Sequence, residues 1–510
     1  MRTMSGIVAA HGPFDPREGE RMLDRLAHRG PDGQGSHALD HAWLGHTRLA
    51  VVDLAGGAQP LRDSTGTYWL VGDGEIYNHA RLRRQLEQRG HVFRSRADQE
   101  SALHLIEADG LAALSRLWGM FAFAGADTDG HFFAARDTMG IAPLYWVRHD
   151  DTTVFASELK AFDPQRRADV EPFPPGHVWT PEGGLAPFRV LADTTPATLP
   201  DTPSDEEPTE AVLSAIRESL IGAVERLLEA DVPVGALLSG GLDSSLVTAI
   251  AARHAHRAGK RFPTFAVGRQ DSADLVAARQ VAEALGTDHH ERVYTDDELI
   301  DWVPEVIRVI ESFDPSLVHS SVPNLLVSKL AARSVKVVLI GEGADELFAG
   351  YGYYGEIDSG AELHQELLST IEGLHIGGLQ RVDRVAGATG LEARTPFLDL
   401  DVVELGLSLP AQWKLSGDRP EKWLLRKAFE GWLPDRLLWR PKEQFGQGTG
   451  AGDVLGSYYA STVSEEEFEA ERGALDPPLR TREEVAYYRL FQRELTGVDP
   501  EHLIGRFAGW

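Results

Sequence analysis

Hydrophobic and polar positions follow two different rhythms along the chain, with a change near residue 200. In the first part, short runs rich in β-branched and aromatic residues predict strands of a half-buried sheet. These runs are Trp43–Val52, Tyr68–Val71, Phe121–Ala124 and His131–Ala135. Two stretches with helical spacing, Arg17–Ala27 and His79–Arg89, interrupt them. The mixture predicts a layered domain of sheets and helices.

The second part alternates buried strands with helices. The strand candidates are Val232–Leu238, Pro263–Val267, Arg292–Tyr294 and Val335–Ile340, and the helix candidates are Leu246–His256, Leu275–Leu285 and Val322–Ala332. Such alternation is typical of βαβ units on a parallel sheet, whose ligands lie at the carboxyl ends of the strands. From about Leu391 onward the pattern is mostly helical.

A proline-rich, acidic stretch separates the two rhythms. Residues 194–210 contain four prolines and a cluster of acids, which neither continue a helix nor fit a central strand. We therefore expect one domain over residues 1–193, a linker over 194–210 and a second domain over 211–510. This division suits a chain of 510 residues.

Composition narrows the function classes. The chain has 50 Lys+Arg against 78 Asp+Glu, a formal net charge of −28, which argues against nucleic acid or an anionic membrane as a partner. The sequence has no cysteine, so disulfides, thiolate zinc sites, iron–sulfur clusters and cysteine nucleophiles are excluded. No apolar run approaches the ~20 residues of a membrane span, and Met1–Ala10 lacks the layout of a signal peptide. We expect a soluble protein of the cytoplasm.

A candidate phosphate loop follows the Val232–Leu238 strand and opens the next helix. Its residues are Ser239, Gly240, Gly241, Leu242, Asp243, Ser244 and Ser245. Two glycines let backbone amides close on an anion, serine hydroxyls donate to phosphate oxygens, and the helix N-terminus adds positive potential. Asp243 would repel phosphate unless Mg²⁺ bridges the two, so its carboxylate is a natural metal ligand. The same residue types also suit a plain helix cap.

Two further segments carry candidate chemistry. Residues 340–346, Ile-Gly-Glu-Gly-Ala-Asp-Glu, place three carboxylates among glycines at the end of a buried strand. That pattern suits a metal ion or a proton transfer, and it also fits an ordinary polar turn. Residues 442–445, Lys-Glu-Gln-Phe, lie in a loop and supply one of only eight lysines in the chain.

Together these segments resemble the class B asparagine synthetases. The C-terminal motifs are VPVGALLSGGLDSSL, LIGEGADELFAGY, LEARTPFLD and WRPKEQF, and the N-terminal motifs are HRGPDG, HTRLAVVDLAGGAQPL, DGEIYNH, ARDTMGIAPLY and FASELKAF. They cover about residues 4–450 in family order. The resemblance implies an α/β protein: an N-terminal Ntn-hydrolase-like αββα sandwich and a C-terminal parallel-sheet ATP-pyrophosphatase domain of the adenine nucleotide alpha hydrolase type.

The resemblance also implies a reaction. A carboxylate is adenylated with ATP and Mg²⁺, and ammonia or an amine then attacks the acyl-adenylate to give an amide, AMP and pyrophosphate. The positions that match the family's ATP and pyrophosphate site are Leu238, Ser239, Gly240, Gly241, Asp243, Ser244, Ser245, Val267 and Gly341. By the same match, Asp243 and Asp345 would bind Mg²⁺. Lys442 would neutralise charge on the α-phosphate, and Glu342 would deprotonate the attacking nitrogen.

The glutaminase-like half departs from the family at its catalytic centre. Ser5 stands where the family has an N-terminal cysteine, and the residues before it remove the free α-amine that acts as base. Translation from Met4 would leave a serine-type glutaminase open. Asp73 stands at the oxyanion-hole asparagine, where a carboxylate would destabilise an oxyanion. The matching glutamine-binding positions remain as Arg48, Glu75 and Asp98. We predict no glutaminase activity, with the pocket kept as architecture or for binding.

The acceptor side departs as well. Leu317 and His319 replace a family threonine and arginine, and Ile340 replaces a serine. An arginine lost opposite a substrate carboxylate leaves charge unmatched. We expect an acid other than aspartate or an amine larger than ammonia, although drift around an unchanged site would leave the same pattern. His319 and Tyr351 are the candidate residues of the acceptor pocket.

The leading interpretation is an ATP-dependent amide synthetase without glutaminase activity. Its partners would be a small-molecule carboxylate and ammonia or an amine, with ATP and Mg²⁺, without nucleic acid or membrane; a homodimer is left open. Alternatives are an ammonia- or glutamine-dependent asparagine synthetase, a β-lactam synthetase-like ring closure and an inactive binding or regulatory homologue. Glu342 stands where the β-lactam synthetases tend to carry tyrosine, which favours the asparagine synthetase side.

Overall fold

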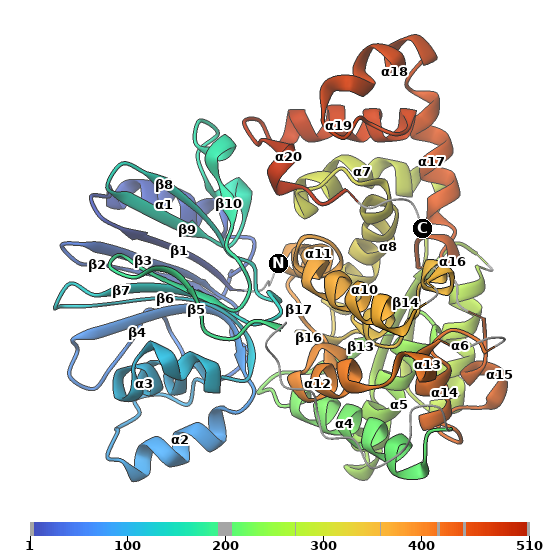
Figure 1. Ribbon diagram of the computed structural model, residues 1–510, viewed down its shortest axis with the longest axis horizontal. Coiled ribbons are helices and arrows are strands. Elements are labelled where there is room, and N and C mark those ends of the chain that lie inside the picture. The colour runs from blue at the N-terminus through green and yellow to red at the C-terminus, as the bar shows by residue number, and fades with distance from the viewer. Residues whose placement is uncertain are drawn as a thin grey trace.

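The computed structural model describes residues 5–191, 207–270, 272–357, 359–415, 419–441 and 445–506. Two bodies lie side by side in it (Figure 1). The N-terminal body consists mainly of strands, and the C-terminal body consists of a short sheet surrounded by helices. Of the predicted linker over 194–210, only residues 207–210 fall among those described.

Two six-stranded antiparallel sheets form the N-terminal body. The first has the order β10 (Glu171–Pro172), β8 (Tyr145–His149), β9 (Thr152–Ala156), β1 (Gly6–His11), β3 (Ala42–Arg48), β2 (Gly33–Ala38). The second has the order β12 (Gly184–Pro187), β11 (His177–Thr180), β7 (Phe132–Arg136), β6 (Gly119–Asp127), β5 (Tyr68–Ile76), β4 (Leu61–Arg62). Strands β1, β3, β6 and β7 are buried along nearly their whole length, because each sheet packs on the other sheet and on helices.

Helices cover the outer faces of the two sheets. Helix α1 (Pro16–Arg25) packs on β1 and β3, and helix α3 (Gln99–Asp109) packs on β5 with α2 (His79–Gln88) beside it. Between the sheets, one apolar cluster joins inward side chains of both. It includes Ile7, Ala9, Leu44 and Phe155 of the first sheet and Val71, Ala122, Ala124 and Trp179 of the second. The predicted αββα sandwich is therefore confirmed.

One predicted strand is too long. The Trp43–Val52 run forms strand β3 only as far as Arg48. Beyond it the chain turns, because the Arg48 guanidinium donates to the carbonyl oxygen of Asp53 at 2.7 Å and Asp53 adopts a positive φ of 48°. A side-chain hydrogen bond to the backbone thus overrides the β-branched run at Val51 and Val52.

The C-terminal body is built on a parallel five-stranded sheet. Its order is β15 (Asp288–Val293), β14 (Pro263–Gly268), β13 (Val234–Leu237), β16 (Val337–Leu339), β17 (Glu392–Arg394). Every neighbouring pair is parallel, as the strand–helix alternation predicts. The chain moves outward from β13 in both directions, so the strand order reverses there. The carboxyl ends of β13 and β16 therefore flank the crevice in which this kind of sheet binds ligands.

Helices connect and cover this sheet. Those nearest the crevice are α5 (Leu242–Arg257), α6 (Ala273–Leu285), α7 (Asp296–Ile310), α8 (Pro315–Ala331), α9 (Ala344–Leu347), α10 (Gly360–Gly373) and α11 (Gly378–Thr389). The remaining longer ones are α4 (Glu210–Leu227), α12 (Leu400–Ser408), α14 (Trp423–Ala428), α17 (Ala451–Ser461), α18 (Glu465–Glu471) and α19 (Arg482–Glu494). Within the described residues, no helix combines the length and apolarity of a membrane span.

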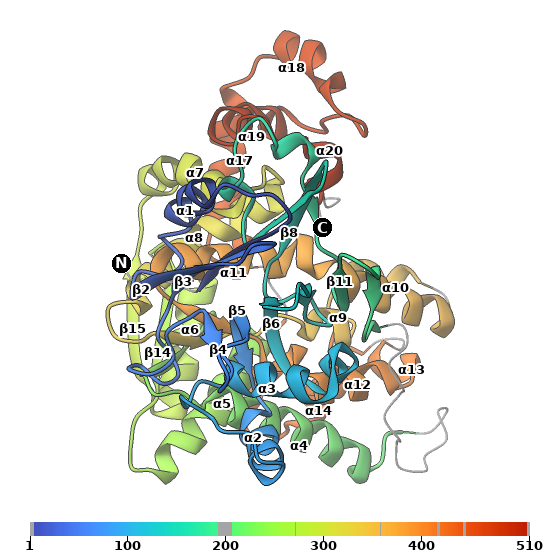
Figure 2. The ribbon, with the colours of Figure 1, turned by 90° about the vertical axis from the view of Figure 1, so that its left-hand side faces the viewer.

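The last helices extend the C-terminal body beyond the sandwich. Helices α17 and α19 pack on each other and on α7 and α8. Seen from the side of the sandwich, they project past its edge (Figure 2). This placement brings the start of α19 to the N-terminal part of α8, beside the crevice.

Candidate active site

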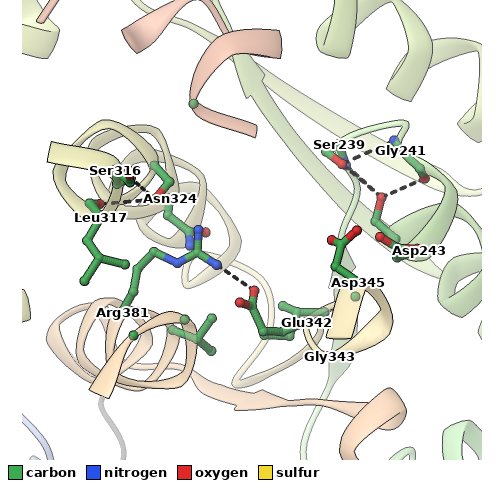
Figure 3. Close-up of a pocket in the computed structure, with 18 of the residues that line it drawn as sticks. Ser239, Gly241, Asp243, Ser316, Leu317, Asn324, Glu342, Gly343, Asp345 and Arg381 are labelled. Carbon is green, nitrogen blue, oxygen red and sulfur yellow. Dashed lines mark hydrogen bonds and ion pairs between the residues drawn. The ribbon is translucent and has the colours of Figure 1, made fainter. Parts of the chain in front are cut away.

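A cavity of about 880 Å³ opens at the carboxyl ends of β13 and β16. Helices α8 and α11 form its opposite wall (Figure 3). Most sequence-predicted site residues line it, namely Leu238, Ser239, Gly241, Asp243, Ser244, Val267, Gly341, Glu342, Asp345, His319 and Tyr351. Gly240 and Ser245 belong to the same loop and helix but are not among the lining residues. Lys442 lies outside the described residues.

The phosphate loop forms a tight turn between β13 and α5. Gly240 has a positive φ of 79°, and a Cβ there would lie 2.5 Å from the backbone nitrogen of Ala278, so only glycine fits. The Ser239 Oγ accepts from the Gly241 amide at 3.3 Å and lies 3.1 Å from the Ser244 Oγ. Helix α5 then runs for 16 residues with its N-terminus at the cavity. The loop thus combines hydroxyls with a helix N-terminus, the arrangement that suits an anion.

Lys422 joins the two carboxylates predicted to bind metal. Its Nζ lies 2.5 Å from the Oδ2 of Asp243 and 2.7 Å from the Oδ1 of Asp345. Burial opposes the charge of Lys422, but the two carboxylates raise its pKa above the ordinary value. Sequence reasoning missed this residue. Its signal was the scarcity of lysine, which marks each of the eight as a candidate.

The chemistry of this pair suits a divalent cation. Asp243 and Asp345 come from the loop after β13 and the loop after β16, and their oxygens converge on one positive group. Carboxylate oxygens beside a phosphate site are the ligands that Mg²⁺ prefers. The two aspartates therefore fit the metal role that the sequence predicts for them.

Glu342 extends across the cavity toward α11 (Figure 3). Its Oε2 accepts from the Arg381 Nη2 at 2.6 Å. Gly378 makes room for this contact, because a Cβ there would lie 2.1 Å from the Glu342 Oε1. The arginine, which sequence reasoning also missed, fixes the carboxylate between the phosphate loop and α8. A base at this place can reach a nucleophile that lies between the phosphate loop and α8.

A further carboxyl group lies next to Asp345. Glu346 is 1% exposed, and its Oε1 accepts from the Tyr351 hydroxyl at 2.5 Å. Burial and the nearby Asp345 raise the pKa of Glu346 to about 8. Tyr351 therefore lines the cavity while its hydroxyl is engaged with Glu346, rather than with open solvent.

His319 meets a residue from the far end of the chain. Its Nε2 lies 2.5 Å from the Oε1 of Glu483, at the start of α19. The cavity wall also includes Ser316, one helical turn before His319, and Ser320, which directly follows it; Arg480 adds an ion pair to Asp314 at 3.1 Å. The C-terminal helices thus complete the acceptor side, a contribution that the sequence pattern does not reveal.

The predicted vestigial glutaminase residues meet around a buried arginine. Arg29 is fully buried, and its Nε donates to the Ser5 carbonyl at 2.7 Å while its Nη2 lies 2.9 Å from Asp73. The same guanidinium binds Asp383 of α11 at 2.8 and 2.9 Å. Burial raises the pKa of Asp73 to about 7 despite Arg29. The oxyanion-hole position is therefore held in an ion-pair network that links both bodies.

The predicted glutamine-binding residues are also engaged with protein groups. The Arg48 guanidinium donates to backbone carbonyls, including that of Leu54 at 3.2 Å. Glu75 lies 3.7 Å from the Nη2 of Arg394, and Asp98 accepts from the Ile76 amide at 2.6 Å. Burial, followed by the charge of Asp98, raises the pKa of Glu75 well above its ordinary value.

Comparisons with known proteins agree with this architecture. The family model described as glutamine amidotransferase domain matches residues 4–174, and the model described as asparagine synthase matches residues 215–361 and 355–496. An asparagine synthetase [glutamine-hydrolyzing] 2 from Arabidopsis thaliana is 40% identical over 469 residues, covering 88% of this chain and 79% of its own length. A probable asparagine synthetase [glutamine-hydrolyzing] from Dictyostelium discoideum is 37% identical, covering 95% and 92%.

One matching solved structure is a more distant enzyme. A glutamine phosphoribosylpyrophosphate amidotransferase from B. subtilis, complexed with ADP and GMP, covers 52% of this chain and 67% of its own at 23% identity, with a TM-score of 0.32. The sequence relationships are far stronger and span both bodies. The chain therefore belongs to the asparagine synthetase family, a family of ATP-dependent, AMP-forming carbon–nitrogen ligases.

Proposed function

We propose that this chain adenylates a carboxylate with ATP and Mg²⁺ and transfers the acyl group to ammonia or an amine, without hydrolysing glutamine. The observation that carries the proposal is the convergence of Asp243 and Asp345 on one cation, 2.5 and 2.7 Å from Lys422 Nζ, beside the phosphate loop. An inactive binding homologue would have no need for two carboxylates held in this way. When bound, Mg²⁺ would supply positive charge to the phosphates.

The first step forms an acyl-adenylate. A carboxylate oxygen of the acid attacks the α-phosphorus of ATP, and the bond from that phosphorus to the bridging oxygen breaks, so pyrophosphate leaves. The Ser239 and Ser244 hydroxyls and the N-terminus of α5 are placed to hold the leaving group. Lys442 is the predicted residue for charge on the α-phosphate.

The second step forms the amide. The nitrogen attacks the acyl carbon, the carbon–oxygen bond to the phosphate breaks, and AMP leaves with the bonding electrons. Glu342 accepts a proton from the nitrogen, held in position by Arg381 at 2.6 Å. An amine from solution is favoured over ring closure within one substrate because Glu342 stands where the β-lactam synthetases tend to carry tyrosine.

Loss of glutaminase activity is part of the proposal. Ser5 accepts a hydrogen bond from the Leu49 amide at 3.2 Å, and its carbonyl is tied to Arg29. Asp73 offers a carboxylate bound to the same arginine where an uncharged donor would be needed. Ammonia-dependent asparagine synthesis is the second candidate, since the described relatives are asparagine synthetases. A cytoplasmic location and a homodimer remain proposals from the sequence.

The test is exchange of labelled pyrophosphate into Mg²⁺-ATP across a panel of carboxylic acids that includes aspartate. We expect exchange with at least one acid, and its loss in the Asp243→Asn and Asp345→Asn variants. Asp297→Asn, an exposed position at the start of α7, is the matched control. Exchange that needs no acid, or that survives both site variants, would overturn the proposal.

A further inference from the structure

The end of the cavity opposite the phosphate loop is lined mainly by apolar side chains. It lies beyond Glu342, between α8 and α11 (Figure 3). Its lining residues, here called the apolar end, are Leu317 and Val327 of α8, Val382, Val385 and Ala386 of α11, and Phe265, Val338, Ile340 and Ala393 of the sheet and the loop after β16. Several of them are less than 5% exposed, so this wall belongs to the packed core and keeps its shape.

The basic side chains around the apolar end already pair with carboxylates. Arg381 pairs with Glu342 at 2.6 Å, and His319 pairs with Glu483 at 2.5 Å. Arg480 pairs with Asp314 at 3.1 Å and with Glu484 at 3.1 Å. Among the described residues on this side of the cavity, each of these basic side chains already pairs with a carboxylate, and the buried Arg381 Nε has no hydrogen-bond partner and can donate to a neutral oxygen of a ligand. A buried carboxylate without a partner is strongly disfavoured.

Neutral polar groups are present at the same wall. Asn324 and Ser320 lie one helical turn apart on the α8 face that lines the cavity. The Ser320 hydroxyl donates to the Ser316 carbonyl at 2.9 Å, whereas Figure 3 shows the Asn324 side chain directed toward the space beside Arg381. An amide can hydrogen-bond a carbonyl, hydroxyl or amide of a ligand and cannot balance a charge.

These observations rest on the proposed function and extend it to the substrate. We propose that the acid activated by this chain is a monocarboxylic acid with an apolar body, which lies in the apolar end between α8 and α11. The reacting carboxylate lies toward Glu342 and the phosphate loop. A neutral polar group on the acid meets Asn324. A second carboxylate is excluded because its only neighbours would be apolar side chains and arginine or histidine groups already bound to acids.

The test compares hexanoate with adipate, acids of equal chain length that differ by one carboxylate, together with 3-phenylpropionate and L-aspartate. Pyrophosphate exchange is measured at saturating Mg²⁺-ATP. We expect kcat/KM for hexanoate or 3-phenylpropionate to exceed that for adipate and aspartate by at least 100-fold. Equal or greater values for adipate or aspartate would overturn the inference and leave the proposed function standing. If none of the acids supports exchange in protein shown to bind ATP, the proposed function itself is overturned.

Two variants test whether the apolar end sets the preference for hexanoate over adipate. Val382→Lys places a cation in the apolar end, and we expect the hexanoate-to-adipate ratio of kcat/KM to fall at least 10-fold. Leu317→Thr replaces the apolar isobutyl group by a shorter side chain with a hydroxyl and tests the same wall without adding a charge; the ratio should fall about 3-fold. Val92→Lys, at a 63% exposed position of the sandwich, is the matched control and should leave the ratio unchanged. A ratio unaltered in both folded site variants would contradict the assignment.

Discussion

The Nη2 of Arg29 lies 2.9 Å from the Oδ2 of Asp73, and the same guanidinium binds Asp383 of the synthetase half. A position that would serve glutamine hydrolysis is thereby part of an ion-pair network between the two halves. Glu158 completes it at 2.8 Å from the Arg29 Nη1. The sandwich is thus tied to α11, the helix that also carries Arg381 and so positions Glu342.

Arg29→Met should weaken the whole protein. It leaves Asp73, Glu158 and Asp383 without the guanidinium that they share, and breaking a buried ion pair typically costs about 3–5 kcal/mol. Denaturant unfolding measures the loss. Arg17→Met, at an exposed position of α1, should change the free energy of unfolding by less than about 0.5 kcal/mol. Two variants of equal stability would show that the network contributes nothing.

Glu342→Gln should separate the two half-reactions. The amide keeps the size and the contact to Arg381 but cannot accept a proton, so amide formation should fall about 10²–10⁴-fold. Pyrophosphate exchange should stay within a few-fold, because adenylation does not use this base. Glu356→Gln, at an exposed position near the cavity, serves as control. Parallel loss of both activities would exclude the role of Glu342 as base.

Lys422→Met should make stability depend on magnesium. The variant removes the ammonium that lies between Asp243 and Asp345, so repulsion between the two carboxylates should grow and the Tm should fall by several degrees in the presence of a chelator. Added Mg²⁺ should restore much of the lost Tm. It should raise the Tm of the parent protein by less. Lys427→Met, on the same helix with a 40% exposed side chain, should respond as the parent does. A Lys422 variant without any magnesium response would argue against the metal role of the two aspartates.

His375 should make the contact between the halves sensitive to acid. Its Nδ1 lies 3.5 Å from the Nη1 of Arg136, and burial together with that charge lowers the pKa of His375 to about 3. Below pH 6.5 the unfolded chain binds a proton that the folded chain does not bind until about pH 3, so the stability contributed by neutral His375 is lost as the pH falls. At pH 5 this amounts to about 2 kcal/mol.

The matching experiment compares His375→Gln with the parent by denaturant unfolding at pH 7 and pH 5. The difference in unfolding free energy between the two proteins should shift by about 2 kcal/mol in favour of the variant at the lower pH. His254→Gln, with a half-exposed side chain, should show no such shift. An identical pH dependence for parent and His375 variant would rule out a buried neutral histidine.

Local patterns predict most of the architecture. The Pro263–Val267 and Val335–Ile340 runs form parallel strands because their apolar residues are buried on both faces, and the glycine-containing loops that follow have to lie at the same sheet edge. The end of β3 is missed because it depends on where the Arg48 side chain binds. Residues 315–321 join helix α8 although their serines and proline weaken the helical pattern, since Asp314 caps the helix and Pro315 suits its first turn.

The residues of the candidate site also fall into two groups, those that the sequence predicts and those that it misses. Asp243, Asp345 and Glu342 stand in local motifs, so their residue types and spacing are enough to identify them. Lys422 and Glu483 come from segments without a motif, and only the tertiary packing brings them to the cavity. The scarcity of lysine was the one sequence signal for Lys422. Nothing in the periodicity of α19 distinguishes Glu483 from the charged residues Arg482 and Glu484 on either side of it.

Amide synthesis without glutaminase activity is measured by following the products formed from Mg²⁺-ATP, the best acid of the exchange panel and hydroxylamine as a small nitrogen nucleophile. We expect AMP, pyrophosphate and hydroxamate in equal amounts. We also expect that glutamine neither replaces hydroxylamine nor yields glutamate. Formation of ADP in place of AMP, or robust release of glutamate from glutamine, would contradict the proposed function.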